Sequence, residues 1–444
     1  MNKNDKSINP NGITVVLPED KKGNVTVYHR KNGEKCGTLT MSYEAYQLLN
    51  SNERIPDYTR FLFCPKSSPD VLPNPALEVL YDNFDFKEDG KRYLPIFFQF
   101  EGDHGHRDIA KDQLLPLVEA SGLYNLLEGT KDYGKESAKP KVIMASLSKG
   151  TLIGNWAMME SENLIQNKKS DENKNFNKLI NGSLAFGAPM SGTPMGSVDE
   201  LRKILVDNQK TLYKKILIEM FCRFQEKATK GKKIYDEHCI GGQFHESKYK
   251  TKENEIILNQ ILDKTHFVRG ELKPGHFRKK MLRVPKAASK LTLYHITKGV
   301  IPGKRDLHAK TKETSAKRIL KEPTVAAQKA IYKAAKEFIP KSKEEIQECR
   351  EDLLITRPQT LVCWLGNYIL SEAGYKRNDG IVPIKDEDSN IFKHFKNVDG
   401  SHMDLMRNEN LRNGIKFFEE IFESKDDRKQ KPLTLSKPDY SYSR

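Results

Sequence analysis

The sequence predicts an α/β protein, with a mostly parallel sheet flanked by helices and a large basic, mainly helical insertion. Three observations predict this class. Two apolar runs, YLPIFFQF ending at residue 100 and KVIMASLS ending at residue 148, have the character of strands that are buried on both faces. Helical spacing follows each run, and alternating strands and helices are typical of parallel sheets with crossover helices. The excess positive charge is concentrated in one internal segment, residues 201–350.

The first 90 residues are predicted to form the strand-rich start of the core, and residues 91–200 form its centre. In the first part, β-type runs alternate with turn-forming clusters. In the second part, strands alternate with amphipathic helices. The expected strands are 23–30, 36–46, 59–64, 93–100, 141–148 and 182–189, and the expected helices are 109–129 and 151–165.

Residues 201–350 are predicted to be the basic helical insertion, residues 351–425 the return of the chain to the core, and residues 426–444 a disordered tail. The insertion contains 36 of the 75 Lys and Arg residues but 17 of the 60 Asp and Glu residues. Helices are expected within it at 199–227 and 324–339. The return is expected to contain a strand at 358–370 and a helix at 410–424.

Composition limits the cellular location. Hydrophobic residues make up 37% of the 444 residues, and no run approaches the roughly 18 apolar residues of a membrane span. The opening has no apolar signal-peptide core. We therefore expect a cytoplasmic protein, or an effector secreted by another route, with peripheral membrane association as an option. The six scattered cysteines are expected to be reduced.

The stretch KVIMASLSKGTL at 141–152 raises the question of a nucleophilic serine. A nucleophile at a sharp turn from strand to helix needs small residues two positions before and after it. Around Ser148 these residues are Ser146 and Gly150, whereas Ser146 would have the bulky Met144 at the first position. Ser148 is therefore the preferred candidate, although the usual pattern has glycine where Ser146 stands.

A serine nucleophile needs a base and a carboxylate that orients the base. Asp379 lies in the turn RNDGIVP, and His402 lies in VDGSHMDL. Serine, aspartate and histidine thus occur in the chain order that α/β-hydrolases use. Asp386, Asp388 and Asp404 remain alternatives for the acid, and Asp404 is disfavoured because it is so close in sequence to His402.

Together with LAFGAPMSGTP at 184–194, these stretches resemble the lipase branch of the α/β-hydrolase superfamily. The resemblance covers residues 91–200 and 355–425. It implies that Ser148 is the nucleophile, Asp379 the acid and His402 the base, and that no cofactor or metal is needed. It also implies two oxyanion donors, the amide of Lys149 and an amide from the loop FEGDHGHRD, where Gly102 or Asp103 is the candidate.

On the same resemblance the basic insertion is expected to act as a cap or lid over the active site. Its segment 264–321 is expected to bind an anionic membrane surface, with Phe267, Phe277, Leu282 and Val284 entering among the lipid headgroups. No nucleic acid is expected, because RNA-binding signatures are absent from the sequence. The expected phosphate or membrane contacts are Arg278, Lys279, Lys280, Arg283 and Lys286.

Two other motifs occur near the oxyanion loop. His104, His106 and Asp108 could be metal ligands, but no distal carboxylate or histidine pair completes such a site. The triplet HRD at 106–108 occurs in kinase catalytic loops, but neither a Gly-rich loop nor DFG accompanies it.

The expected function is a serine hydrolase that cleaves acyl esters, as a lipase or phospholipase at an anionic membrane. Two alternatives stay open. One is a thioesterase that acts on acyl-protein or acyl-CoA through the same three residues. The other is a catalytically inactive hydrolase fold that binds anionic lipid or nucleic acid, for which the basic insertion would be the functional part.

Overall fold

The computed structural model describes the chain in segments that include most of the expected core. Contacts divide the chain into two compact units, one of Met1–Leu272 with Leu365–Arg444, and one of Lys273–Trp364. The described residues are 5–8, 12–18, 23–31, 34–51, 55–66, 86–88, 90–100, 105–127, 140–167, 171–190, 192–193, 195, 219, 251–273, 282–291, 294, 340, 342–353, 358–384, 392–405 and 408–427.

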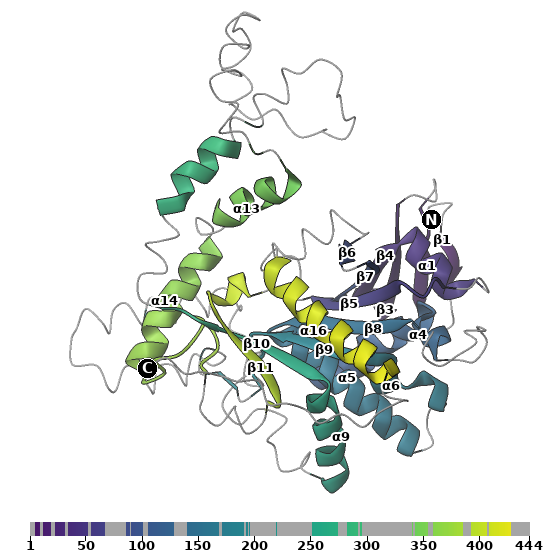
Figure 1. The fold of residues 1–444 in the computed structure, drawn as a ribbon. Helices are drawn as coiled ribbons and strands as arrows, with labels where there is room; N and C mark the ends of the chain where they lie inside the picture. The colour runs from purple at the N-terminus through teal and green to yellow at the C-terminus, as the bar shows by residue number, and fades with distance from the viewer. Residues whose placement is uncertain are drawn as a thin grey trace, which may run out of the picture. The chain divides into compact units, whose positions relative to one another are not determined.

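The described strands of the first unit form one sheet in the order β1-β2-β3-β4-β7-β5-β8-β9-β10-β11, with β6 paired to β7 (Figure 1). Pairing is antiparallel from β1 to β4, between β4 and β7 and between β6 and β7. It is parallel from β7 through β5, β8, β9 and β10 to β11. The predicted α/β class is confirmed. The strands are β1 (Asp5–Ile8), β2 (Ile13–Val16), β3 (Asn24–Lys31), β4 (Glu34–Ser42), β5 (Thr59–Lys66), β6 (Phe86–Glu88), β7 (Lys91–Phe100), β8 (Lys141–Leu147), β9 (Ile180–Phe186), β10 (Thr265–Glu271) and β11 (His394–Asp399).

Helices follow most of the parallel strands, as crossover connections require. The α-helices are α1 (Tyr43–Asn50), α3 (His106–Ile109), α4 (Leu115–Ala120), α5 (Lys149–Gln166), α6 (Phe176–Leu179), α9 (Lys252–Asp263), α13 (Lys343–Leu353), α14 (Pro358–Glu372) and α16 (Asn408–Asp427). A π-helical turn η1 (Ala110–Leu114) joins α3 to α4, and short 3₁₀ turns are η2 (Leu123–Leu126), η4 (Glu172–Lys174) and η10 (His402–Asp404).

The inner parallel strands are apolar on both faces, and alternate residues of β5 enter two different cores. In β5, Phe61 and Phe63 pack in a core that includes Trp156 of α5. Leu62 and Cys64 of the same strand pack in the core beneath α16. Because successive strand residues point to opposite faces, a strand covered on both sides needs a continuous apolar run. This is why the runs of β5, β7 and β8 were recognisable in the sequence.

Helix α16 crosses one face of the sheet (Figure 1), and its backbone packs closely against strand β9. A Cβ atom at Gly182 of β9 would lie 2.6 Å from the Phe418 ring, and one at Gly414 of α16 would lie 2.5 Å from Leu184. Glycine at both positions therefore lets the helix and the strand approach. The helix predicted at 410–424 is confirmed, and it buries Leu411, Ile415, Phe418 and Phe422.

The strand order reverses around β5, which lies between β7 and β8. The chain passes from β5 to β7 on one side and then crosses to β8 on the other side. In open α/β sheets such a reversal leaves a crevice at the carboxyl ends of the strands, where ligands bind. The fold thus directs attention to the residues that follow β8, β9, β10 and β11.

Several predicted elements are corrected. The strand predicted at 358–370 is wrong, because these residues lie in helix α14. Its length and its start at a proline, which is favoured in the first helical turn, fit a buried helix better than a strand. The run predicted as a strand at 36–46 ends at Ser42, whose hydroxyl accepts a hydrogen bond from the amide of Ala45 and caps α1.

Five strands of the sheet were not predicted from the sequence: β1, β2, β6, β10 and β11. β10 lies inside the stretch 201–350 that was expected to be helical, and β11 is the edge strand beside it. The second unit begins only at Lys273. In that unit, helical residues 282–291 and α13 share a small apolar cluster with Ala287, Leu291 and Cys349. The helices expected at 199–227 and 324–339 lie outside the described residues, except for residue 219.

A search of the described helices for a stretch long and apolar enough to cross a bilayer finds none. None of the cysteines that the structure describes, Cys36, Cys64, Cys349 and Cys363, forms a disulfide.

Candidate active site

Ser148 lies at the sharp turn that joins β8 to α5. Strand β8 is buried along its length and ends at Leu147, and helix α5 begins at Lys149. The amide of Ser148 donates a hydrogen bond to the carbonyl oxygen of Phe186 on β9 (2.9 Å), and its own carbonyl accepts from the amide of Thr151 (3.0 Å). The backbone of Ser148 is therefore fixed on both sides, and its side chain is at the amino end of an 18-residue helix.

The backbone of Ser148 is strained. Its φ is 51° and its ψ is −123°, and among the described residues it is the one non-glycine residue with positive φ. Such conformations cost about 1–3 kcal/mol and are concentrated at functional sites. The Ser148 side chain makes no capping hydrogen bond to the helix that it precedes. Serine at a helix start usually makes such a bond, so the turn holds the hydroxyl away from the helix amides.

The residues two positions on either side of Ser148 show why the turn needs small side chains. A Cβ atom at Gly150 would lie 2.6 Å from the carbonyl oxygen of Pro65 at the end of β5. Ser146 is fully buried, and its hydroxyl is satisfied by Thr151 Oγ1 (2.8 Å) and by the carbonyl oxygen of Leu184 (3.2 Å). Serine in place of the usual glycine is thus accommodated by a hydrogen bond to the first turn of α5.

Asp379 is held in a tight turn after α14. The residue is 1% exposed, and its Oδ1 accepts hydrogen bonds from the amides of Ile381 (2.9 Å) and Val382 (2.7 Å). The carbonyl oxygen of the preceding residue, Asn378, accepts a bond from the amide of Leu272, just past β10 (2.8 Å). The acid is therefore positioned by the carboxyl end of β10, although the two segments are far apart in the chain.

His402 follows β11 and is 5% exposed. Its Nδ1 lies 2.7 Å from Asp379 Oδ2, and its backbone amide donates to the carbonyl oxygen of Asp379 (2.8 Å). Because an ionised carboxylate only accepts hydrogen bonds, this geometry assigns the imidazole proton to Nδ1. Nε2 then carries the lone pair that a general base needs.

The serine turn and the histidine meet at Phe186 and Gly187, at the end of β9. The Ser148 amide binds the carbonyl of Phe186, and a Cβ atom at Gly187 would lie 2.7 Å from Cε1 and Nδ1 of His402. Gly187 has a φ of 53°, which glycine adopts without strain. Glycine at this position therefore lets the imidazole lie directly against the end of β9, next to the turn that carries Ser148.

Glycine in β10 likewise leaves the space that Asp379 occupies. A Cβ atom at Gly270 would lie 2.8 Å from Asp379 Cβ and 2.8 Å from the carbonyl oxygen of Gly400. Two further contacts hold the turn that contains Asp379. The Thr193 hydroxyl donates a hydrogen bond to the carbonyl oxygen of Ile381. Gly366 of α14 packs against the backbone of Gly380. The Asp379–His402 pair thus lies in a closely packed frame.

The predicted oxyanion donors are described in part. Lys149 is the first residue of α5, where helix amides have no intrahelical acceptor. Its ammonium group lies 5.3 Å from the ring centroid of Phe100, the last residue of β7. Gly102 and Asp103, the candidates for the second donor, lie outside the described residues.

The alternative acids have different surroundings. Asp404 Oδ2 accepts from the amide (3.0 Å) and the hydroxyl (2.8 Å) of Ser401, an interaction that caps the turn η10. Asp386 and Asp388 lie outside the described residues. Among the acids that could pair with His402, Asp379 is thus the described residue that contacts the imidazole.

The motif with His104, His106 and Asp108 shows no metal centre in its described part. His104 lies outside the described residues, and His106 is buried at the start of α3. Across the described residues, no cluster of three or more His, Cys, Asp or Glu side chains could hold a metal ion. Arg107, from the same motif, pairs with Glu160 of α5 (2.6 Å).

The expected membrane contacts fall into three groups. Phe267 is a correction: it is 1% exposed and stacks on Phe392 with ring centroids 4.0 Å apart, so it cannot enter a lipid surface. Arg283 and Lys286 lie on helical residues 282–291, next to Leu282, which is 74% exposed. Arg278, Lys279, Lys280 and Phe277 lie outside the described residues.

Sequence reasoning missed residues that support the site from a distance. Thr151 forms a hydrogen bond with Ser146. The absence of side chains at Gly270 and Gly366 lets the turn that contains Asp379 pack closely against β10 and α14. Positive φ at Gly187 could have been suspected from its place after a buried strand. The contacts that Gly270 makes with the acid turn join residues far apart in sequence, and the Ser146–Thr151 pair, although five residues apart, has no recognisable pattern.

Comparisons with known proteins add little to this geometry. No family model matches the chain, and no curated protein matches its sequence. Brefeldin A esterase, titled a bacterial homologue of human hormone sensitive lipase, is 15% identical over 60% of this chain and 63% of its own, with a TM-score of 0.26. Juvenile hormone epoxide hydrolase from the silkworm Bombyx mori is 9% identical over 91% of this chain and 80% of its own, with a TM-score of 0.26.

The chain thus spans just under two thirds of the esterase. A TM-score of 0.26 means that neither structure superposes well on this chain. The α/β assignment rests on the strand order, and the candidate site rests on the distances given above.

Proposed function

We propose that this chain is a serine hydrolase that cleaves acyl esters, with Ser148 as nucleophile, His402 as general base and Asp379 as the residue that orients it. One observation carries the proposal. A buried imidazole is held by a buried carboxylate at 2.7 Å, and it lies against Gly187, next to the strained turn of Ser148. An oriented base beside a serine that is fixed in a costly conformation is the arrangement that activates a hydroxyl.

The proposed reaction proceeds in two halves. Ser148 Oγ attacks the ester carbonyl carbon while His402 Nε2 takes the hydroxyl proton. The bond to the alcohol then breaks, and Nε2 returns the proton to the departing oxygen. Water attacks the acyl-serine with the same base, which releases the carboxylic acid and restores Ser148 and neutral His402.

The negative oxygen of each tetrahedral intermediate needs hydrogen-bond donors. The amide of Lys149 at the start of α5 is the proposed first donor, and an amide of Gly102 or Asp103 the second. The amino end of α5 adds a favourable partial positive charge. Removing one such donor typically costs about 100- to 1000-fold in rate.

Hydrolysis of a short p-nitrophenyl ester tests the activity. We expect Ser148→Ala and His402→Ala each to lower kcat/KM by roughly 10,000-fold or more, because residues of such a triad act as a unit. His29→Ala on β3 is the control, and it should keep the wild-type rate. Wild-type protein that is folded but inactive on esters and thioesters of several chain lengths would contradict the proposal.

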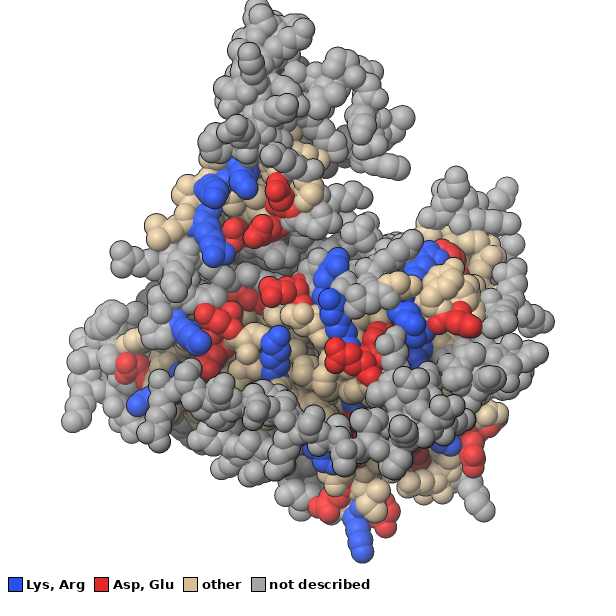
Figure 2. Space-filling view, viewed as in Figure 1, with Lys and Arg blue, Asp and Glu red and all other residues tan. Residues whose placement is uncertain are grey.

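The substrate class that we propose is a lipid ester at an anionic membrane. On the face in Figure 2, the coloured basic and acidic residues are interspersed, so charge alone marks no docking face there. The support comes instead from Leu282, which is 74% exposed beside the basic Arg283 and Lys286. An exposed large apolar side chain next to basic ones suits the headgroup region of a membrane.

Sedimentation with vesicles tests this part separately. Wild-type protein should bind vesicles that contain phosphatidylserine and not pure phosphatidylcholine, and Leu282→Ser with Arg283→Glu should weaken the binding. Lys111→Glu, an exposed charge change in the first unit, is the control. Equal binding of all variants would contradict a membrane role for this helix. Faster turnover of a thioester than of its oxygen ester would instead favour acyl-protein or acyl-CoA as substrate.

A further inference from the structure

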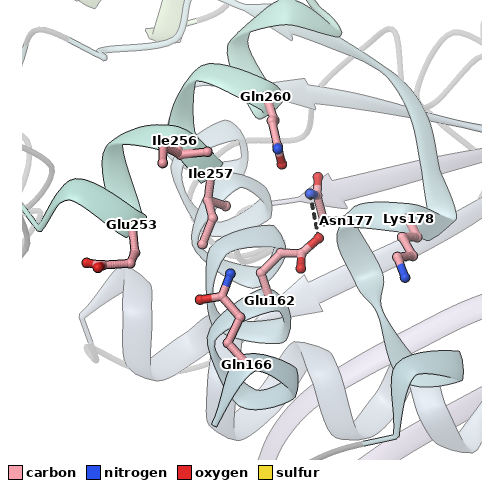
Figure 3. A pocket seen from close by; sticks show the side chains of 8 residues that line it. All are labelled: Glu162, Gln166, Asn177, Lys178, Glu253, Ile256, Ile257 and Gln260. Carbon is pink, nitrogen blue, oxygen red and sulfur yellow. Dashed lines mark hydrogen bonds between the residues drawn. The ribbon is translucent and has the colours of Figure 1, made fainter.

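A pocket lies in the first unit, away from Ser148. It has a volume of about 440 Å³ and is lined by residues of α5, α6 and α9 (Figure 3). Glu162 contributes to it from α5. Because an α-helix rises about 1.5 Å per residue, Glu162 lies about 20 Å along α5 from the serine turn. The pocket is therefore separate from the candidate active site and independent of the proposed function.

The groups that line this pocket can accept several hydrogen bonds, and its two carboxylates outnumber its one cation. Glu162 and Glu253 contribute carboxylates, and Gln166 and Gln260 contribute amides whose oxygens accept. Gln166 is in the last turn of α5, where the partial negative charge of the helix end favours cations. Lys178 is the exposed cation of the lining. This set of groups favours a ligand that carries positive charge and several N–H donors.

Asn177 orients the Glu162 carboxylate, and its own side-chain oxygen is buried without a hydrogen-bond partner in the described part of the protein. The residue is 7% exposed, and its Nδ2 donates to Glu162 Oε1 at 2.9 Å. Because a carboxylate only accepts, this bond fixes which end of the amide is oxygen. Figure 3 shows that Oδ1 is turned away from Glu162. Oδ1 has no partner among the described residues, whereas the large majority of buried side-chain polar atoms have one.

Lys264 contacts the backbone of Asn177, one of the residues that line the pocket. Its Nζ donates to the carbonyl oxygens of Asn177 (2.5 Å) and Ile180 (2.8 Å). Burial lowers the pKa of Lys264 from its ordinary value to about 7, against the opposing effect of Glu162. Near neutral pH this lysine is charged in only part of the molecules, so it does not fully neutralise Glu162.

The α9 side of the pocket is apolar. Ile257 is buried, and Ile256 is 53% exposed, an unusual exposure for a large aliphatic side chain in this protein. We propose that the pocket binds an organic cation, an ammonium or guanidinium group on a short alkyl chain. Its N–H groups would donate to the carboxylates of Glu162 and Glu253, and its methylene groups would cover Ile256.

Ligand-observed NMR with butylamine tests the proposal on the full-length protein at neutral pH. We expect saturable binding to wild-type protein, and a dissociation constant at least about tenfold higher for Glu162→Gln, because a charge-assisted contact is lost. Glu253→Gln should weaken binding in the same direction. Glu255→Gln is the matched control, since Glu255 is an exposed acid of the same helix that does not line the pocket.

Two further probes complete the design. Butanol has the same chain without the charge and should not bind, whereas a blocked lysine, N-acetyl-lysine methylamide, carries the cation on a peptide side chain. If the blocked lysine binds as well as butylamine, the source of the cation is a protein side chain, and if it does not, the source is a free amine. No saturable binding of butylamine, equal binding of butanol, or equal weakening by Glu255→Gln would overturn the proposal.

Discussion

The carboxylate of Asp379 accepts three hydrogen bonds, and their arrangement decides which imidazole nitrogen of His402 is basic. Two backbone amides point at Oδ1, from Ile381 and Val382, and the imidazole points at Oδ2. The two amides fix the carboxylate in one orientation. The proton of His402 is therefore kept on Nδ1, and Nε2 is left to accept the proton of the serine.

Replacing Asp379 with asparagine tests this assignment. Because two amide donors require an oxygen at the Oδ1 position, the new NH₂ group must face His402 Nδ1 and drive the proton to Nε2. We expect kcat to fall by about 10,000-fold, as for the wrong tautomer in other triads, with little change in KM. Asp399→Asn, at the exposed end of β11, removes the same charge and should keep kcat. A small effect of Asp379→Asn would contradict the assignment.

Ser146 and Thr151 form a buried contact across the turn that carries Ser148. Both side chains are fully buried, and their hydroxyls are 2.8 Å apart. Ser146→Ala leaves the Thr151 hydroxyl without this partner, so we expect the free energy of unfolding to fall by about 1–3 kcal/mol.

A double-mutant cycle measured by urea denaturation isolates this contact. Thr151→Val removes the other hydroxyl, and the double variant Ser146→Ala with Thr151→Val should lose less stability than the sum of the single variants. Additive losses would show that the hydrogen bond contributes nothing to the turn.

At the scale of elements, α16 is tied to the sheet by a buried ion pair. Arg60 of β5 donates to Glu419 through Nε (3.0 Å) and a second nitrogen (3.2 Å), and the Tyr93 hydroxyl donates to the same carboxylate (2.8 Å). The side chains of Arg60 and Glu419 are 9% and 7% exposed. Removing one member leaves an uncompensated buried charge, which is far more costly than losing an exposed pair.

Glu419→Ala is therefore expected to lower the free energy of unfolding by about 3–5 kcal/mol. Glu420→Ala, the next residue of the same helix and an exposed one, is the matched control and should change stability little. Thermal and urea denaturation followed by circular dichroism would measure both. Equal losses for the two variants would mean that the loss comes from helix propensity and not from the ion pair.

The elements that could be predicted are those whose burial leaves a pattern in the sequence. β5, β7 and β8 are covered on both faces, so they appear as apolar runs, and α16 shows one apolar face. β11 is an edge strand with mostly exposed residues, and β10 contains His266 and Arg269 within a strongly charged segment. Neither has a clear period, so both were missed. α14 was mistaken for a strand because periodicity alone does not separate buried helices from buried strands.

At the scale of the whole molecule, chain order, more than any single motif, selected the residues of the candidate site. Ser148, Asp379 and His402 were selected because they follow one another in the expected order, each next to turn-forming residues. That Asp379 touches His402 depends on the pairing of β10 with β11, and that pairing joins segments 128 residues apart. Gly270 and Thr193 support the acid only through such distant pairings, so the sequence could not reveal them.

The stability of the whole fold should depend on pH through His266. Burial, and to a lesser extent the charges of His394 and Lys396, lower the pKa of His266 from 6.5 to about 4. Between these two values the unfolded chain binds a proton that the folded protein does not, so stability falls as the pH falls from about 6.5 to about 4. The difference amounts to about 3 kcal/mol.

Urea denaturation of wild-type protein and His266→Phe across this pH range measures the effect. Phenylalanine keeps the ring packing against Phe417, whose centroid lies 4.3 Å from that of His266, and it cannot titrate. The stability of the variant relative to wild type should rise as the pH is lowered. A constant difference across the range would contradict the assigned pKa shift.

Labelling with a fluorophosphonate probe, followed by mass spectrometry of the modified peptide, tests the central claim most directly. Fluorophosphonates react with activated serines, so the wild-type protein is predicted to carry one adduct on Ser148, and His402→Ala is predicted to lose it. The measurement should be made with and without detergent micelles, which would open a lid over the site. No adduct on folded wild-type protein under either condition, or an adduct on another serine, would contradict the assignment of Ser148 as the nucleophile.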